Sequence, residues 1–204
     1  MKKTILLFDI DYTIFDTDIY KRMIAEKFTL KYQLDATRVA LFDEQYEKNL
    51  GNVIGINIKE YSRLFGEQFD ISPDILFTIV MDTKEFYTQS LYPDALVTLT
   101  LLSKEYPLGI FSQGYRDFQE NKLEKCGIMS YFKKEHIFIF PDKTQPSVLK
   151  TLPENAVIIE DKLSVVQKIV PPLRAIHMDR SGTQKYNPSV TSLSGLPSLL
   201  TRLL

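Results

Sequence analysis

Five short apolar segments, separated by helical patterns, constrain the fold of this 204-residue chain more than any other feature. They span residues 4–8, 108–111, 136–140, 156–159 and 173–178. Short continuous apolar runs are typical of strands buried on both faces of a parallel sheet. Helical patterns follow at 95–102, 115–125, 146–152 and 163–170, with a closing helix at 192–204. This alternation predicts a doubly wound, Rossmann-like α/β domain with five parallel strands.

One long segment, residues 16–90, interrupts the alternation because it contains helical patterns and no convincing strand. Four helices are predicted there, beginning near residues 19, 35, 58 and 72. We therefore expect a core of residues 1–15 and 91–204 and an inserted all-helical cap subdomain of residues 16–90. A helical subdomain beside the edge of a sheet is a candidate lid. Its aromatic side chains are expected to form its own core: Tyr20, Phe28, Tyr32, Phe42, Tyr46, Tyr61, Phe65 and Phe69.

The charge balance excludes some classes of partner. The chain has 25 Lys and Arg against 26 Asp and Glu, so it has no basic field to recruit nucleic acid or an anionic membrane. Its apolar runs are too short to cross a bilayer. The single cysteine, Cys126, excludes an intramolecular disulfide and is expected to fill the core. A cytoplasmic protein is the resulting expectation.

Two carboxylates, Asp9 and Asp11, directly follow the first apolar segment. Ligands of open α/β sheets bind at the carboxyl ends of the strands. Two acids on one face repel each other, and a hard divalent cation such as Mg²⁺ is the simplest compensation. One carboxylate could then attack phosphorus while the other moves a proton. On these residues alone, an acidic turn or a helix cap is the plainer interpretation.

The ends of the other strands supply complementary groups. Ser112 and Gln113 follow the second strand, Lys143 follows the third, and Glu160 and Asp161 follow the fourth. Phosphoryl transfer requires a carboxylate that attacks and carboxylates that hold Mg²⁺. It also requires a hydroxyl, backbone amides and an ammonium group to balance the charge on the phosphate oxygens.

Taken in order, these motifs resemble the haloacid dehalogenase-like superfamily, in its phosphatase branch with a helical cap inserted after the first motif. The resemblance covers almost the whole chain. Its four motifs are Asp9-x-Asp11-x-Thr13, Ser112, Lys143 and Glu160-Asp161. It implies the strand order 5-4-1-2-3, with the first strand at the centre of the sheet.

The resemblance implies that Asp9 is the nucleophile and forms an aspartyl-phosphate. Asp11 would protonate the leaving oxygen and then deprotonate the attacking water. The Asp11 backbone carbonyl and the Asp9 and Asp161 carboxylates would hold Mg²⁺.

The remaining motif residues are implied to bind phosphate or to support the site. Lys143 would pair with the nucleophile and the phosphate, and Ser112 and the Gln113 amide would hold phosphate oxygens. Thr13 would support the loop between the two acids, and Glu160 would orient waters or Lys143. The sequence departs from the commonest pattern at Gln113, where a small residue or Asn is usual, and in having one proline rather than two after Lys143.

The segment 50–56 contains two glycines and links two predicted cap helices. Caps of the family use such a loop to touch the substrate, so Asn52, Lys59 and Arg63 are candidate contacts, although such side chains are usually only solvated. His136 and His177 lie on predicted strands without a catalytic partner and are interpreted as structural.

These observations predict a Mg²⁺-dependent phosphatase that acts on a small phosphorylated metabolite. A phosphomutase would use the same residues. A dehalogenase is disfavoured because family members of that kind usually lack the acid that Asp11 supplies, and a non-catalytic phospho-ligand-binding member is disfavoured because all the charged groups are present. The sequence leaves open the carrier of the phosphate and the choice between monomer and homodimer.

Overall fold

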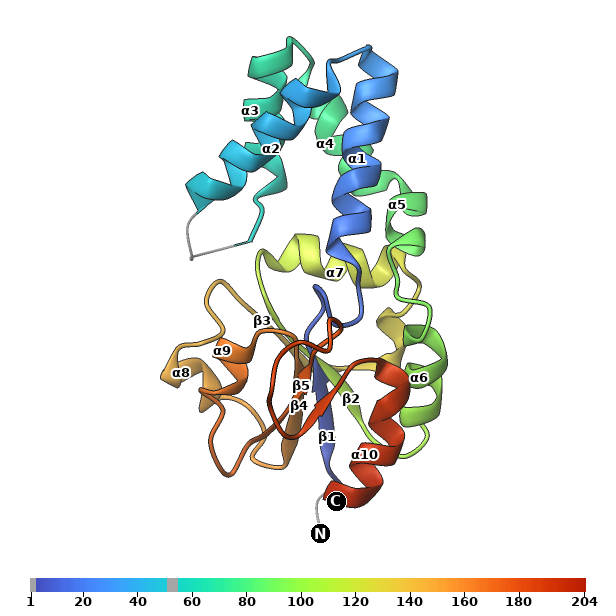
Figure 1. Cartoon of the computed structure of the whole chain (residues 1–204), viewed down its shortest axis with the longest axis vertical. Helices are drawn as coiled ribbons and strands as arrows, with labels where there is room; N and C mark the ends of the chain where they lie inside the picture. Colours follow the sequence, from blue (N-terminus) through green and yellow to red (C-terminus); the bar gives the residue numbers. More distant parts are fainter. Residues whose placement is uncertain (1–2, 51–54) are drawn as a thin grey trace.

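The structure is a computed structural model that describes residues 3–50 and 55–204. Its centre is a six-stranded parallel sheet with the order β3-β2-β1-β4-β5-β6 (Figure 1). The strands are β1 (Ile5–Phe8), β2 (Leu108–Gln113), β3 (Phe132–Phe140), β4 (Ala156–Glu160), β5 (Arg174–Met178) and β6 (Ser189–Val190). The first five strands have the order expected from the resemblance, so the doubly wound fold is confirmed.

The predicted number of strands was too low by one. β6 contains only two residues and pairs with β5 in parallel, with His177 opposite Ser189 and Met178 opposite Val190. Two residues cannot establish a hydrophobic period, and they directly follow the polar segment 180–188. The strand therefore left no recognisable signal in the sequence.

The sheet separates two apolar layers because alternate side chains of a strand point to opposite faces. Leu6 and Phe8 of β1 belong to the larger cluster, whereas Ile5 and Leu7 belong to the smaller one. The larger cluster includes side chains of α6 (Ala95–Leu102), α7 (Arg116–Lys125) and α10 (Leu196–Leu203). The smaller cluster is covered by α8 (Pro146–Leu149) and residues after α9 (Leu163–Val166). Both α8 and α9 are shorter than predicted, and turns replace their last residues.

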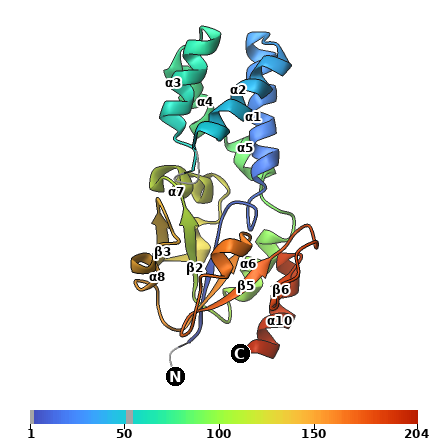
Figure 2. The same ribbon diagram turned by 60° about the vertical axis from the view of Figure 1, so that its left-hand side comes forward.

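Within residues 16–50 and 55–90, the structure has five helices, which lie beyond the carboxyl edge of the sheet (Figures 1 and 2). They are α1 (Thr17–Tyr32), α2 (Ala36–Leu50), α3 (Ile58–Phe69), α4 (Pro73–Asp82) and α5 (Lys84–Gln89). Four were predicted, and the six-residue α5 was missed because it is too short for a clear helical period. All five fall within residues 16–90, although the division into core and cap stays a prediction.

The two connections between the helices and the sheet run side by side. Phe15 and Leu91 form an antiparallel bridge. The Asp16 amide donates to the Ser90 carbonyl at 2.7 Å, and the Tyr92 amide donates to the Ile14 carbonyl at 3.1 Å. The helices are therefore attached through one short two-stranded joint.

The aromatic side chains of the helices pack together, but they do not form the separate core that was predicted. The rings of Phe28 and Phe65 have centroids 5.0 Å apart, and those of Phe42 and Phe65 are 5.1 Å apart. This cluster is continuous with the larger apolar layer of the sheet, through Phe15 and Tyr20, whose centroids are 5.4 Å apart. The helical part therefore shares one apolar core with the sheet.

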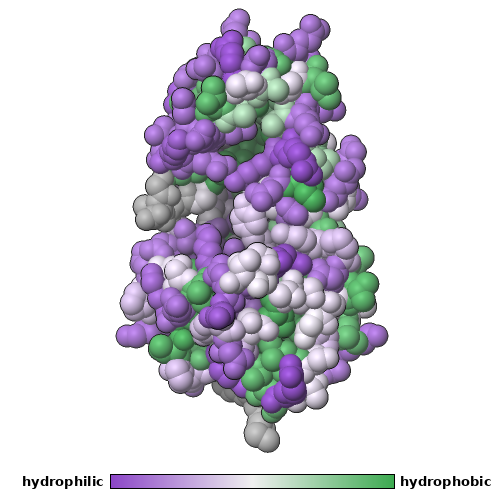
Figure 3. All heavy atoms as spheres, viewed as in Figure 1, coloured by the Kyte–Doolittle hydropathy of each residue, from purple (hydrophilic) through white to green (hydrophobic). Residues whose placement is uncertain are grey.

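On the face shown in Figure 3, hydrophilic side chains dominate over the helices α1 to α4, and the larger hydrophobic patches lie in the lower half. The exposed apolar residues of that half include Leu96, Val97 and Leu101 of α6 and Leu203 of α10. Among the described residues, no helix combines the length and the hydropathy that crossing a bilayer would require.

Candidate active site

The segment after β1 folds into a tight loop that carries the two acids. The Ile10 carbonyl accepts hydrogen bonds from the amides of Ile14 at 2.9 Å and Phe15 at 3.0 Å. Tyr12, which lies between Ile10 and Ile14, has a φ of 59°, in the left-handed region that non-glycine residues rarely occupy. Such backbone strain clusters at functional sites. The loop turns the chain back on itself immediately after Asp9 and leads it into α1.

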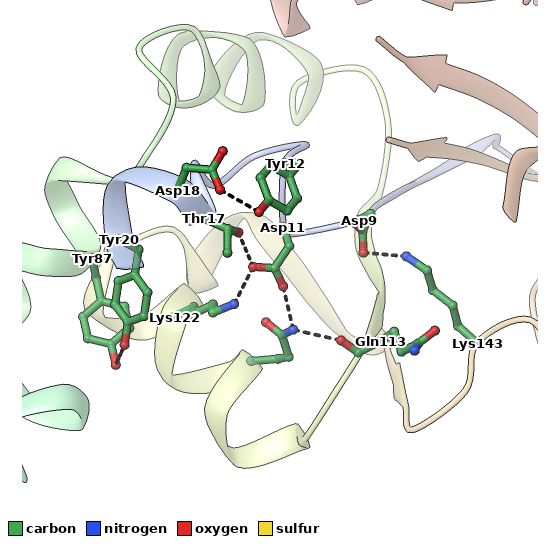
Figure 4. A network of polar contacts seen from close by, with 11 residues as sticks. Asp9, Asp11, Tyr12, Thr17, Asp18, Tyr20, Tyr87, Gln113, Lys122 and Lys143 are labelled. Carbon is green, nitrogen blue, oxygen red and sulfur yellow. Dashed lines mark hydrogen bonds and ion pairs between the residues drawn. The ribbon is translucent and has the colours of Figure 1, made fainter. Parts of the chain in front are cut away.

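Asp9 lies at the end of β1 and is held by Lys143. The Asp9 amide donates to the Ile159 carbonyl of β4 at 2.9 Å. The Lys143 ammonium is 2.7 Å from Asp9 Oδ1 (Figure 4) and 2.6 Å from Glu160 Oε2. Burial alone would lower the pKa of Lys143, but the Asp9 and Glu160 charges outweigh it and raise that pKa above its usual value. Lys143 therefore stays a cation although only 1% of it is exposed.

Three carboxyl groups meet beside this pair. Asp9, Glu160 and Asp161 each offer one oxygen, and the three oxygens lie within 4.8 Å of one another. Asp161 Oδ1 is buried without a hydrogen-bond partner. Burial, and then the charges of Asp9 and Glu160, raise the pKa of Asp161 to about 9. Clustered carboxylate oxygens, one of them unpartnered, suit a hard divalent cation such as Mg²⁺.

His177 contributes to the same cluster from β5. Its Nε2 atom lies 2.9 Å from the backbone carbonyl of Asp161, and the ring is fully buried. It fixes the backbone that presents the Asp161 carboxyl group. His177 thus has the structural role that was expected, and the backbone that it holds is that of a candidate metal ligand, Asp161.

Asp11 lies in a separate polar environment built by helices α1 and α7. Its Oδ1 accepts hydrogen bonds from Thr17 Oγ1 and Lys122 Nζ, both at 2.6 Å, and its Oδ2 accepts one from Gln119 Nε2 at 2.9 Å (Figure 4). Burial raises the pKa of Asp11, but Lys122 and the hydrogen bonds outweigh this effect and lower the pKa to about 2. Sequence reasoning missed Thr17, Gln119 and Lys122.

The expected phosphate-binding residues lie at the end of β2. Ser112 is 1% exposed and its Oγ atom has no hydrogen-bond partner. The Gln113 carbonyl accepts a hydrogen bond from Gln119 Nε2 at 2.9 Å. Gly114 follows with a φ of 142°, a conformation that favours glycine. An unpartnered buried hydroxyl is available for an oxyanion or a water molecule.

Thr13 supports the acidic loop through its backbone rather than its hydroxyl group. Its carbonyl accepts a hydrogen bond from Arg180 Nη2 at 2.6 Å, whereas its buried Oγ1 has no partner. The Arg180 guanidinium lies 3.5 Å from the centre of the Tyr92 ring and 3.3 Å from Asp94. Arg180 therefore links the acidic loop to the second connection between helices and sheet.

A cavity of about 220 Å³ opens between the sheet edge and the helices. Its walls include Asp9, Asp11, Gln113, Lys122 and Lys143. From the helical side, Tyr20, Lys21 and Ile56 also line it. The two carboxylates of the first motif thus face one common space.

Of the candidate cap contacts that the structure describes, Lys59 and Arg63 are not among the residues that line this cavity. Arg63 is paired on α3 with Glu60 and Glu67, and the Lys59 ammonium lies over the Phe77 ring at 5.9 Å. Asn52 lies outside the described residues. Whether Lys59 or Arg63 reaches a substrate stays a prediction. Ile56, from the loop before α3, lines the cavity.

Comparison with known proteins places this geometry in context. The sequence model of the haloacid dehalogenase-like hydrolase family matches residues 6–164 of this chain. A curated relative, glyceraldehyde 3-phosphate phosphatase of Methanothermobacter thermautotrophicus, is 29% identical in a match that covers 78% of this chain and 77% of the relative.

Solved structures share the fold over nearly the whole chain. One described as a haloacid dehalogenase-like hydrolase of Burkholderia xenovorans matches all of both chains with a TM-score of 0.77 and 20% identity. A HAD-hydrolase of Bacillus subtilis, solved with bound magnesium, covers 98% of this chain and 99% of its own, with a TM-score of 0.63 and 18% identity. Structures described as 2-haloacid dehalogenases and as a beta-phosphoglucomutase also share the fold, so the fold alone does not select an activity.

Proposed function

This chain belongs to the haloacid dehalogenase-like hydrolase family, and we propose that it is a Mg²⁺-dependent phosphatase of a small phosphorylated metabolite. One observation carries the proposal. Two carboxylates two residues apart face the same cavity but have separate cationic partners, Lys143 for Asp9 and Lys122 for Asp11. Such a separation of environments is how one site assigns different tasks to two acids.

In the first step, a carboxylate oxygen of Asp9 attacks phosphorus, and the bond between phosphorus and the ester oxygen breaks. Asp11 is a carboxylate in the free site, because its pKa is lowered to about 2. It therefore takes up one proton, from the bound ester or from solvent, and passes it to the departing oxygen, so the alcohol leaves neutral. Lys143, 2.7 Å from Asp9, orients the nucleophile and balances charge on the phosphoryl group.

In the second step, Asp11 as a carboxylate removes a proton from a water molecule that attacks the aspartyl-phosphate. Phosphate leaves, Asp9 is regenerated, and the proton from water stays on the Asp11 carboxyl group until Asp11 releases it to solvent. Asp9, Glu160 and Asp161 are the side chains that would hold Mg²⁺, with the Asp11 carbonyl as the family resemblance implies. The ion would supply positive charge to the phosphoryl oxygens.

Two further observations support a phosphate ester as substrate. The archaeal relative is named a phosphatase of a three-carbon phosphate. Asp11 lines the cavity, and a second acid serves to protonate an alkoxide, whereas a halide leaves without a proton. The position of Asp11 therefore favours phosphoryl transfer over dehalogenation.

A substrate panel tests the proposal. The purified protein with Mg²⁺ is expected to release inorganic phosphate from some members of a panel of triose, glycolate, hexose and nucleoside monophosphates. EDTA should abolish the release and added Mg²⁺ should restore it. Absence of phosphate release across the panel, together with halide release from 2-chloropropionate, would refute the assignment. Conversion of one hexose phosphate isomer into another, without phosphate release, would identify a mutase instead.

We expect the affinity for Mg²⁺ to rise with pH between about 6 and 9. Without metal, Asp161 holds a proton below its pKa of about 9, and Mg²⁺ must displace that proton to bind the carboxylate. Displacing one proton strengthens binding by up to about tenfold for each pH unit. Titration calorimetry in two buffers of different ionisation enthalpy measures both the affinity and the protons released. The Asp161→Asn variant should release fewer protons on binding Mg²⁺ and have a weaker pH dependence, because the pKa of Glu160 is also raised. An affinity independent of pH in the wild type would contradict the expectation.

A further inference from the structure

Lys122 occupies a position on α7 where a polar cation is not expected. The buried face of this helix consists of Phe118, Gln119, Lys122 and Leu123. Only 3% of Lys122 is exposed, and lysines are almost never so buried unless they are paired. Its partner is Asp11, at 2.6 Å. By contrast, Lys125 on the same helix lies at the surface and contacts Asp82 at 3.2 Å.

Aromatic rings hold the Lys122 ammonium in place. It lies 5.2 Å from the centre of the Phe15 ring and 4.7 Å from the centre of the Phe118 ring. Both contacts fall within the range of cation–π attraction. Phe15 belongs to the joint between helices and sheet, so Lys122 is fixed against the loop that carries the catalytic acids.

Gln119 holds the other oxygen of the same carboxylate. Its Nε2 atom donates to Asp11 Oδ2 and to the Gln113 carbonyl, both at 2.9 Å. The Gln119 side chain of α7 thus links Asp11 Oδ2 to the end of β2, and Lys122 of the same helix holds Asp11 Oδ1. The Asp11 side chain keeps 26% of its surface exposed, and both Asp11 and Lys122 line the cavity.

We propose that Lys122 is a positioning residue of the phosphatase reaction, which together with Gln119 holds the Asp11 carboxyl group at the cavity wall where the ester oxygen departs. The inference rests on the proposed function and adds to it residues outside the four motifs. Lys122 acts through Asp11, because its short contact is to that carboxylate.

A merely structural lysine and a positioning lysine have different consequences for the chemistry. A buried ion pair that only fills space can be replaced by apolar side chains of similar volume without harm to the fold. A residue that positions Asp11, the proton carrier, should affect kcat most for esters whose leaving oxygen needs a proton. Alkyl phosphates need one, whereas p-nitrophenolate departs as a stable anion.

The test compares two leaving groups in the Lys122→Met variant. For an alkyl phosphate that the wild type hydrolyses, kcat is expected to fall about 100-fold, within the range of general acid–base catalysis. For p-nitrophenyl phosphate, kcat should fall less than about fivefold, and KM for both esters should be nearly unchanged. Gln119→Met should give the same pattern with a smaller amplitude. It keeps the Asp11–Lys122 ion pair, so it tests the inference even if Lys122→Met fails to fold because Asp11 has lost its cation.

Lys125→Met is the matched control, because it removes a half-buried lysine of the same helix that contacts Asp82 rather than Asp11, and it should leave both rates unchanged. Equal losses for the two esters in both Lys122→Met and Gln119→Met, or no loss in either, would overturn the inference while the wild type remains a phosphatase. A wild type that hydrolyses neither ester would overturn the proposed function itself.

Discussion

Replacing Asp9 by Asn is expected to abolish turnover of every phosphate ester that the wild type accepts. The amide is not a nucleophile toward phosphorus, so the aspartyl-phosphate cannot form. Loss of the residue that makes the covalent bond usually lowers kcat by about 10⁴-fold or more. The substitution preserves the volume of a side chain that is only 4% exposed, and Lys143 keeps Glu160 as its second partner at 2.6 Å. Phosphate release in Mg²⁺, followed with p-nitrophenyl phosphate, measures the effect.

Asp16 provides a matched control in the same segment. Its Oδ1 accepts a hydrogen bond from the Ile19 amide at 3.0 Å and so caps α1. Asn is an equally good cap residue, so Asp16→Asn should keep both the stability and the activity of the wild type. A circular-dichroism melting curve establishes that each variant is folded. If folded Asp9→Asn retains activity within about tenfold of the wild type, the nucleophile lies elsewhere.

The fold could be predicted where buried strands and helices have a recognisable pattern of apolar residues. Every residue of β1 and of β4 is buried, and strands buried on both faces read as continuous apolar runs. β6 and α5 are short and left no periodic pattern. The order of the strands came from the family resemblance, because periodicity identifies strands and does not order them.

The motif residues could be placed together because the carboxyl ends of parallel strands share one edge of the sheet. Asp9, Lys143 and Glu160 follow three different strands, and the two ion pairs at 2.7 Å and 2.6 Å join them. This proximity follows from topology, so strand ends in the sequence were enough to anticipate it. The roles of these residues in catalysis stay predictions.

The environment of Asp11 could not be predicted in this way. Its partners Lys122 and Gln119 come from a helix, and the sequence of α7 is that of a polar helix in which nothing distinguishes Lys122 from Lys125. A signal was nevertheless present. Helical neighbours three and four residues apart share a face, so Lys122 falls on the same stripe as Phe118. A lysine in an apolar stripe indicates a buried cation that needs an anion, although the sequence does not name that anion.

Replacing Lys143 by Met is expected to remove activity and also to destabilise the protein severely. Lys143 is 1% exposed and contacts both Asp9 and Glu160, and the Asp161 carboxyl group adjoins them. Removing one partner from a buried ion pair leaves uncompensated charge, which lowers the free energy of unfolding by about 3–5 kcal/mol. The loss of stability should be greatest at high pH, where the remaining carboxyl groups are ionised and repel one another. As pH falls, Glu160 and Asp161, whose pKa values are raised, bind protons, and the repulsion between them decreases.

Mg²⁺ should restore part of this stability, because it binds the same carboxylates in the folded state. A ligand at 100 times its dissociation constant stabilises the folded state by about 2.7 kcal/mol. Urea unfolding of wild type and Lys143→Met at pH 6 and 8, with and without Mg²⁺, separates the two effects. Lys150→Met, an exposed lysine in the segment after α8, should behave like the wild type. Equal stability of Lys143→Met and wild type without Mg²⁺ would mean that Lys143 does not neutralise the carboxylates. A larger response of Lys143→Met to Mg²⁺ would mean that ammonium and metal ion neutralise the same three groups.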